Sequence, residues 1–167
     1  MPEAVSDTGP VLHLQEIGQL AALQGVAPLV LPDLVAQELE VRGSGAAALV
    51  EAGVELRIAW IETSEWQEIL RAVGPQLQPA DAQVFALARQ ASFQSLTLTD
   101  DLALRRILES HGGEVAGSVG ILVRAYVSGR ISRDEVERSI LALAHDSTLH
   151  LSRAFRNYLQ VLLKELL

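Results

Sequence analysis

Cysteine is absent from the 167 residues, and lysine and methionine each occur once. The lack of cysteine excludes disulfide bonds, cysteine-based zinc sites and thiol nucleophiles, and it fits a reducing compartment, so we expect a cytoplasmic protein. No run of about 18 apolar residues is present, so no membrane-spanning helix and no membrane partner are expected. The stretch MPEAVSDTG has no basic region followed by an apolar core, so no signal peptide is expected either.

The composition is that of a globular chain, because apolar residues make up 49% of it. Its length suits one domain with a full core. The net charge is −8, which argues against non-specific, salt-driven binding to nucleic acid. Aromatic residues make up only 4%, and we expect the two tryptophans, Trp60 and Trp66, to be core residues rather than platforms for stacked bases.

Short β-type runs alternate with helical patterns along the first three quarters of the chain. The β-type runs are 4–7, 29–31, 54–60, 95–99 and 114–116, and the pattern after residue 128 is helical only. An apolar stripe after Pro10 (Leu12, Ile17, Leu20 and Leu23) indicates one helix there. Strands that alternate with helices of 10–15 residues predict an α/β fold with three α/β/α layers and a mainly parallel central sheet. We therefore predict a domain over residues 1–128, with a C-terminal helical extension (129–167) packed on it.

Acidic residues occur where the predicted strands end or the predicted helices begin. They are Asp7 in VSDTGP, Glu38 in LVAQELE, Asp81 in PADAQVFALA, and Asp100 and Asp101 in LTLTDD. In an open parallel sheet these places converge at the carboxyl edge, where the strand order reverses. Clustered carboxylates repel one another unless a cation lies between them, so the pattern predicts a site for a hard divalent ion such as Mg²⁺.

Each acid also has a simpler interpretation. Asp7 and the pair Asp100 and Asp101 would serve as helix N-caps, and an acid such as Asp81 is favoured by the helix dipole in any first turn. Glu38 lies beside the apolar face of its helix, yet it would also suit the surface. These alternatives stay open when the acids are considered one at a time.

Neighbouring polar side chains would support such a site. Hydroxyl groups on Ser6, Thr8 and Thr99 are placed to orient a neighbouring carboxylate. Arg105 and Arg106 follow the last acid within about a turn and would contact a phosphate, or else lie on a solvated helix face.

The order of these motifs resembles the PIN-domain family, metal-dependent nuclease-like proteins that include toxin ribonucleases of toxin–antitoxin pairs. The most specific match is VSDTGPVLHLQEIGQLAAL, which is similar to a PIN subgroup that opens with a strand, D-T-[SG]-P and a helix containing I-G-x-L. Later matches are PDLVAQEL, ADAQVFALA, TDDLALR and GSVGILVRA followed by GRI. One departure is Ala80-Asp81, where the subgroup usually has Gly-Glu, so this side chain is one methylene shorter.

The resemblance implies a PIN-like fold and a metal-dependent ribonuclease that hydrolyses phosphodiester bonds with Mg²⁺ or Mn²⁺. Carried across residue by residue, the family's four catalytic acids fall on Asp7, Glu38, Asp81 and Asp101, with Asp100 as a further candidate ligand beside Asp101. The expected partners are an RNA substrate and, if the chain is a toxin, an antitoxin protein.

Two further hypotheses concern partners. The fold could instead be a catalytically inactive module that binds nucleic acid or protein. The aliphatic C-terminal helix, which carries Val161, Leu162, Leu163, Leu166 and Leu167, leads us to expect a homodimer, with packing of this helix on its own domain as the alternative.

Overall fold

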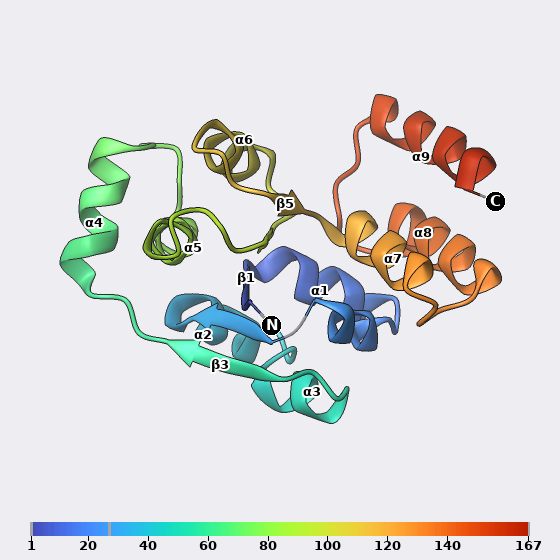
Figure 1. The fold of residues 1–167 in the computed structure, drawn as a ribbon, viewed down its shortest axis with the longest axis horizontal. Coiled ribbons are helices and arrows are strands. Elements are labelled where there is room, and N and C mark those ends of the chain that lie inside the picture. The colour runs from blue at the N-terminus through green and yellow to red at the C-terminus, as the bar shows by residue number, and fades with distance from the viewer. Residues whose placement is uncertain (1, 27, 167) are drawn as a thin grey trace.

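A five-stranded parallel sheet forms the centre of the computed structural model, which describes residues 2–26 and 28–166 (Figure 1). Its strands are β1 (Ala4–Ser6), β2 (Leu29–Pro32), β3 (Leu56–Ala59), β4 (Thr97–Leu98) and β5 (Val115–Ala116), in the order β3-β2-β1-β4-β5. The helices are α1 (Thr8–Glu16), α2 (Asp33–Val41), α3 (Ala46–Glu51), α4 (Thr63–Ala72), α5 (Pro79–Gln90), α6 (Leu102–Ser110), α7 (Ser118–Val127), α8 (Arg133–Asp146) and α9 (Arg153–Leu166), with a 3₁₀ helix, η1 (Leu20–Gly25). This confirms the predicted α/β fold.

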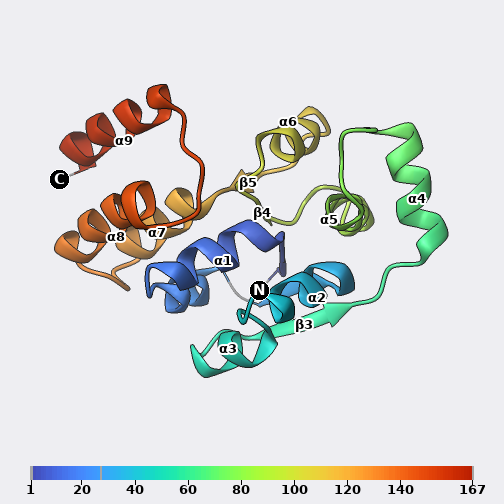
Figure 2. The same ribbon diagram turned by 180° about the vertical axis from the view of Figure 1, so that it is seen from behind.

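Helices cover both faces of the sheet. In the two opposite views α4, α5 and α6 lie to one side of the strands, and α1, α7 and α8 lie to the other (Figures 1 and 2). All residues of β1 and β2 are buried, as expected for central strands covered on both faces. None of the helices within residues 2–26 and 28–166 is long and apolar enough to cross a membrane.

The strand order reverses at β1. The chain passes from β1 to β2 and β3 on one side, and then returns to place β4 and β5 on the other. Val5 therefore pairs with Val30 of β2 and with Thr97 of β4. The carboxyl ends of β1 and β4 therefore lie side by side at this reversal, the place where open α/β sheets hold their ligands.

The C-terminal helices pack on the rest of the chain. Val136, Ile140 and Leu143 of α8 are buried, and α8 lies against α7 and α1. The segment that joins α8 to α9 is held to α1, because the Thr148 hydroxyl donates a hydrogen bond of 2.7 Å to Glu16. Leu163 of α9 is buried, whereas Leu167 and the Leu166 side chain, both named in the dimer hypothesis, lie outside the described residues.

Two expectations about local structure are wrong. The apolar stripe after Pro10 is not one helix: α1 begins at Thr8, and the chain turns at Gly18 with φ of 72° before η1. A positive φ ends a right-handed helix and suits glycine, which has no Cβ to clash. Trp60 is not a core residue, because it follows the edge strand β3 and is 80% exposed.

A buried polar network ties α5 to the ends of β2 and β3. The Asp33 carboxylate accepts hydrogen bonds of 3.1 Å from the Ile61 amide and from the Gln83 side chain. The Gln83 carbonyl oxygen in turn accepts one of 3.0 Å from the Leu34 amide. Gln83 is 1% exposed, so its hydrogen bonds form away from competing water.

The substitution Gln83→Met keeps the side-chain length and removes both hydrogen bonds. We expect it to lower the free energy of unfolding by about 2–3 kcal/mol, because a buried carboxylate and a backbone amide lose a partner. Urea denaturation measures the change. Gln90→Met is the matched control, since Gln90 lies on the same helix and is exposed, and it should stay within about 0.5 kcal/mol of wild type. Equal stability of the two variants would contradict the role given to Gln83.

Candidate functional site

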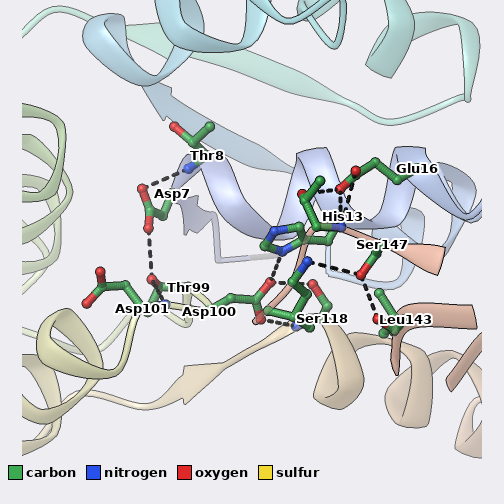
Figure 3. A network of polar contacts seen from close by, with 12 residues as sticks. Asp7, Thr8, His13, Glu16, Thr99, Asp100, Asp101, Ser118, Leu143 and Ser147 are labelled. Atoms are coloured by element: carbon green, nitrogen blue, oxygen red, sulfur yellow. Dashed lines mark hydrogen bonds and ion pairs between the residues drawn. The ribbon is translucent and has the colours of Figure 1, made fainter. Parts of the chain in front are cut away.

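Asp7 lies at the carboxyl edge of the sheet, between the end of β1 and the start of α1. It is 7% exposed, and both of its carboxylate oxygens accept hydrogen bonds. Oδ1 accepts one of 2.8 Å from the Thr8 amide, and Oδ2 accepts one of 2.8 Å from the Thr99 hydroxyl (Figure 3). Asp7 therefore is an N-cap, as the simpler interpretation proposed, and its carboxylate is also held by β4 through Thr99.

Thr99 connects Asp7 to Asp101. The Thr99 hydroxyl donates to Asp7 and accepts a hydrogen bond of 3.0 Å from the Asp101 amide. Asp101 is exposed, and its Oδ1 accepts a hydrogen bond of 2.9 Å from Leu104 at the start of α6. Like Asp7, Asp101 caps the helix that follows it and keeps its second oxygen for other partners.

Glu38 and Asp81 reach the same region from α2 and α5. The Thr8 hydroxyl donates a hydrogen bond of 2.6 Å to Glu38 Oε2, as a residue that orients a carboxylate would. Asp81 Oδ2 accepts one of 2.9 Å from the Gln78 amide in the first turn of α5. Glu38 is exposed and Asp81 is half-buried, so these two side chains are less constrained than Asp7.

The charges of these acids act on one another. The pKa of Asp7 is raised to about 7, chiefly by burial and in addition by the negative charges of Asp81 and Asp101, while the hydrogen bonds from Thr99 and Thr8 oppose the shift. The pKa of Asp81 is also raised, first by burial and then by Asp101 and Glu38, while its hydrogen bond from Gln78 opposes the shift. Asp7, Glu38, Asp81 and Asp101 thus form one electrostatic group, here called the four acids.

In the part of the chain that the structure describes, no basic side chain forms an ion pair with the four acids. A buried carboxylate beside like charges and without a cationic partner is costly, and its raised pKa expresses that cost.

The four acids suit a hard divalent cation by their chemistry, because all of their donor atoms are carboxylate oxygens. The four carboxylates lie farther apart than the ligands around a bound ion do. Among the described residues, no three acidic or histidine side chains are close enough to hold one ion. Asp7 is the fixed member, and exposed Glu38 and Asp101 are the ones with rotational freedom.

Asp100 lies apart from the four acids. Its Oδ2 is 2.7 Å from His13 Nδ1 of α1 and accepts a hydrogen bond from the Ser118 hydroxyl, and its Oδ1 accepts one of 2.7 Å from the Ser118 amide. The carboxylates of Asp100 and Asp101 point in opposite directions (Figure 3). Asp101 therefore lies toward Asp7, whereas Asp100 is hydrogen-bonded to His13 and Ser118.

Three other residues predicted for the site have different surroundings. The buried Ser6 hydroxyl donates to the Asp7 main-chain carbonyl at 2.9 Å, so it contacts the backbone rather than a carboxylate. Arg105 Nη1 lies 3.4 Å from Glu109 on the same helix and 3.5 Å from the Val115 carbonyl. Arg106 is exposed on α6.

Sequence reasoning missed His13 and Ser118. Both belong to apolar helical patterns, and their partner Asp100 is far from them in the sequence. The one available signal was the pair of adjacent acids, since Asp101 alone suffices as the N-cap of α6 and leaves Asp100 without a role.

Comparison with known proteins gives one match. The model of a family described as a PIN domain (DUF3368) matches residues 3–165. Neither the curated proteins nor the solved structures contain a significant match to this chain.

The raised pKa of Asp7 predicts a pH-dependent effect of Asp7→Asn on stability. Between pH 3.8, the ordinary value, and about 7, the folded protein holds this proton more tightly than the unfolded chain does. Wild-type stability therefore loses up to about 4 kcal/mol from this group as pH rises through that window. In metal-free buffer, Asp7→Asn should gain stability relative to wild type as pH rises.

Thermal unfolding at several pH values between 4 and 8 checks this prediction. Asp134→Asn is the control, because Asp134 is exposed on α8 and should show no such trend. A constant difference between wild type and Asp7→Asn across this range would contradict the electrostatic origin of the effect.

Proposed function

This chain belongs to the PIN-domain family, and we propose on that premise that it is a metal-dependent endoribonuclease. PIN domains are generally nucleases, which hydrolyse phosphodiester bonds, and they typically use divalent metal ions. The finer statement, that this chain cleaves RNA with Mg²⁺ or Mn²⁺ held by the four acids, is our proposal.

The observation that carries the proposal is the buried Asp7 carboxylate. It is fixed by two hydrogen bonds, it has acidic neighbours, and its pKa is raised to about 7. A divalent cation would offset these negative charges and displace the proton that Asp7 otherwise retains. Such a group is costly for stability alone, which favours a functional role.

In the proposed mechanism Asp7, Glu38, Asp81 and Asp101 would hold the metal. When bound, Mg²⁺ or Mn²⁺ supplies an activated water and stabilises charge on the scissile phosphate and the leaving oxygen. Thr99 holds the Asp7 carboxylate in one orientation and also holds the main chain of Asp101. Thr8 orients Glu38 through its hydroxyl. The hydrogen bonds from Thr8 and Thr99 fix the direction of the Asp7 carboxylate before substrate arrives.

A groove beside the acids supports a single-stranded substrate. Its volume is about 380 Å³, and it is lined by Leu34, Gln37, Glu38, Val41, Gln78, Pro79 and Ala80. Its apolar walls suit the faces of unstacked bases, which single-stranded RNA offers and a duplex does not. Glu38 belongs both to the groove and to the four acids, so a strand bound there would pass the proposed metal.

Cleavage of a fluorescent single-stranded RNA tests this proposal. Asp7→Asn and Asp101→Asn should each lower the rate at least about 100-fold, because both remove a proposed metal ligand, and chelation of divalent ions should abolish cleavage. Asp134→Asn should cleave like wild type. A single-stranded DNA of the same sequence distinguishes a ribonuclease from a general nuclease.

Cleavage at the same rate by wild type and by both site variants would indicate a contaminating nuclease and contradict the proposed ribonuclease activity.

The second candidate function is an inactive module that binds nucleic acid or protein. The wide spacing of the acids favours it, since no three acidic or histidine side chains in the described residues are close enough for one ion.

We also propose a homodimer that forms through α9. Leu159 and Leu163 of this helix are buried, whereas Phe155, Tyr158 and Val161 are 38%, 55% and 51% exposed. The rings of Phe155 and Tyr158 lie 5.9 Å apart, so they form one apolar surface. Burial of large aromatic side chains is typical of contacts between subunits.

Multi-angle light scattering at micromolar concentration should give twice the chain mass for wild type, and one chain mass for Tyr158→Glu. Glu68→Gln is the control, because Glu68 is exposed on α4, on the other side of the sheet from α8. A monomeric wild type would contradict the proposed homodimer.

The proposed role as the toxin of a toxin–antitoxin pair, with an antitoxin protein as partner, comes from the family resemblance alone.

A further inference from the structure

Asp100 has more hydrogen-bond donors around it than any of the four acids. Three donors reach its carboxylate: His13 Nδ1 at 2.7 Å, the Ser118 amide at 2.7 Å and the Ser118 hydroxyl at 2.5 Å. They come from α1, which follows β1, and from the first residue of α7, which follows β5. Asp100 itself follows β4, so the contacts join the segments after three neighbouring strands. His13, Asp100 and Ser118 are here called the Asp100 cluster.

We propose that His13 and Ser118 are positioning residues that act through Asp100 to hold Thr99 and Asp101 in place for the metal. This inference rests on the proposed function, because it assigns the cluster a role toward the same site. It does not make Asp100 a ligand, since the carboxylate already has three donors that compete with a cation for its lone pairs.

The cluster is well placed to be rigid. The side chains of His13 and Asp100 are 12% and 10% exposed, and Ser118 is fully buried. Asp100 also faces the N-terminus of α7, where the helix dipole and the free amide of Ser118 favour a negative charge. Hydrogen bonds to an ionised group are roughly twice as strong as neutral ones, so these contacts hold Asp100 firmly.

The backbone transmits the restraint on Asp100 to its neighbours, Thr99 and Asp101. Asp100 lies between Thr99, which donates to Asp7, and Asp101, a proposed ligand. Peptide units are planar, so a fixed Asp100 leaves few dihedral angles free on either side. The Asp101 amide is held in addition by the Thr99 hydroxyl, and the Thr99 amide by the Ala116 carbonyl at 3.0 Å. Loss of the cluster would remove the contacts that tie this turn to α1 and α7 and leave its hydrogen bonds to β1, β5 and α6.

Gly117 makes the close approach of Asp100 to α7 feasible. A Cβ atom at Gly117 would lie 2.6 Å from Asp100 Oδ1, which is shorter than real Cβ contacts. The φ angle of Gly117 is −95°, so alanine is allowed there by backbone conformation. Gly117→Ala therefore displaces the Asp100 carboxylate without straining the chain.

The hydrogen bonds also fix the tautomer of His13. An ionised carboxylate has acceptors only, so the ring nitrogen that faces Asp100 must be the one that carries hydrogen. The metal-free protein should therefore have His13 protonated on Nδ1, which nitrogen chemical shifts of the imidazole ring report.

The test compares His13→Leu with His13→Asn. Leucine removes the donor, whereas the asparagine amide nitrogen occupies nearly the place of Nδ1 and keeps it. Calorimetry with Mn²⁺ should show about 10- to 100-fold weaker binding for His13→Leu, the usual effect of removing an outer partner. Binding by His13→Asn should stay within about threefold of wild type, and Gly117→Ala should resemble His13→Leu. His145→Leu, at an exposed histidine of α8, is the control.

A second readout needs no metal. Hydrogen exchange of the Asp101 and Leu104 amides should be faster in His13→Leu than in wild type, while exchange in α8 stays unchanged. Wild-type Mn²⁺ affinity in His13→Leu, or a His13 ring protonated on Nε2, would overturn the inference and leave the proposed function standing. A folded wild type that binds no Mn²⁺ would overturn the proposed function, and with it the role of the cluster toward a metal.

Discussion

The burial of the Asp7 carboxylate is the constraint on which the rest of the site depends. Asp7 ends the central strand of the sheet and begins α1, so its position follows from the fold rather than from a flexible loop. Its two oxygens are held by Thr8 and Thr99, and the nearest charges are negative. Natural proteins keep groups that lower stability in this way mainly where function needs them.

The topology explains how residues far apart in the sequence meet. Because β4 returns to the other side of β1, Thr99 lies beside Asp7 although 92 residues separate them. The helices that follow these strands begin with acids that accept backbone hydrogen bonds, at Asp7 and Asp101. A capping role does not exclude ligation, since a carboxylate oxygen that accepts one hydrogen bond keeps a second lone pair.

The sequence predicted the sheet and its parallel strands from local periodicity. The rule about carboxyl edges pointed to acids at the strand ends, the resemblance to the PIN-domain family selected the four acids among them, and their role as ligands stays a prediction. It could not separate Asp100 from Asp101, since adjacent residues differ in direction only once the turn between β4 and α6 is known. His13 and Ser118 were missed for a related reason: their partner, Asp100, is more than 15 residues away from either. Trp60 was placed in the core by its residue type, and only the sheet order reveals that β3 is an edge.

The central claim is that the four acids share a divalent cation, and calorimetric titration of metal-stripped protein with Mn²⁺ tests it most directly. The account predicts binding by wild type in the micromolar to millimolar range, release of a proton near pH 7, and loss of binding in Asp7→Asn. A folded wild type that binds no Mn²⁺, or an Asp7→Asn variant that binds it equally well, would contradict the account.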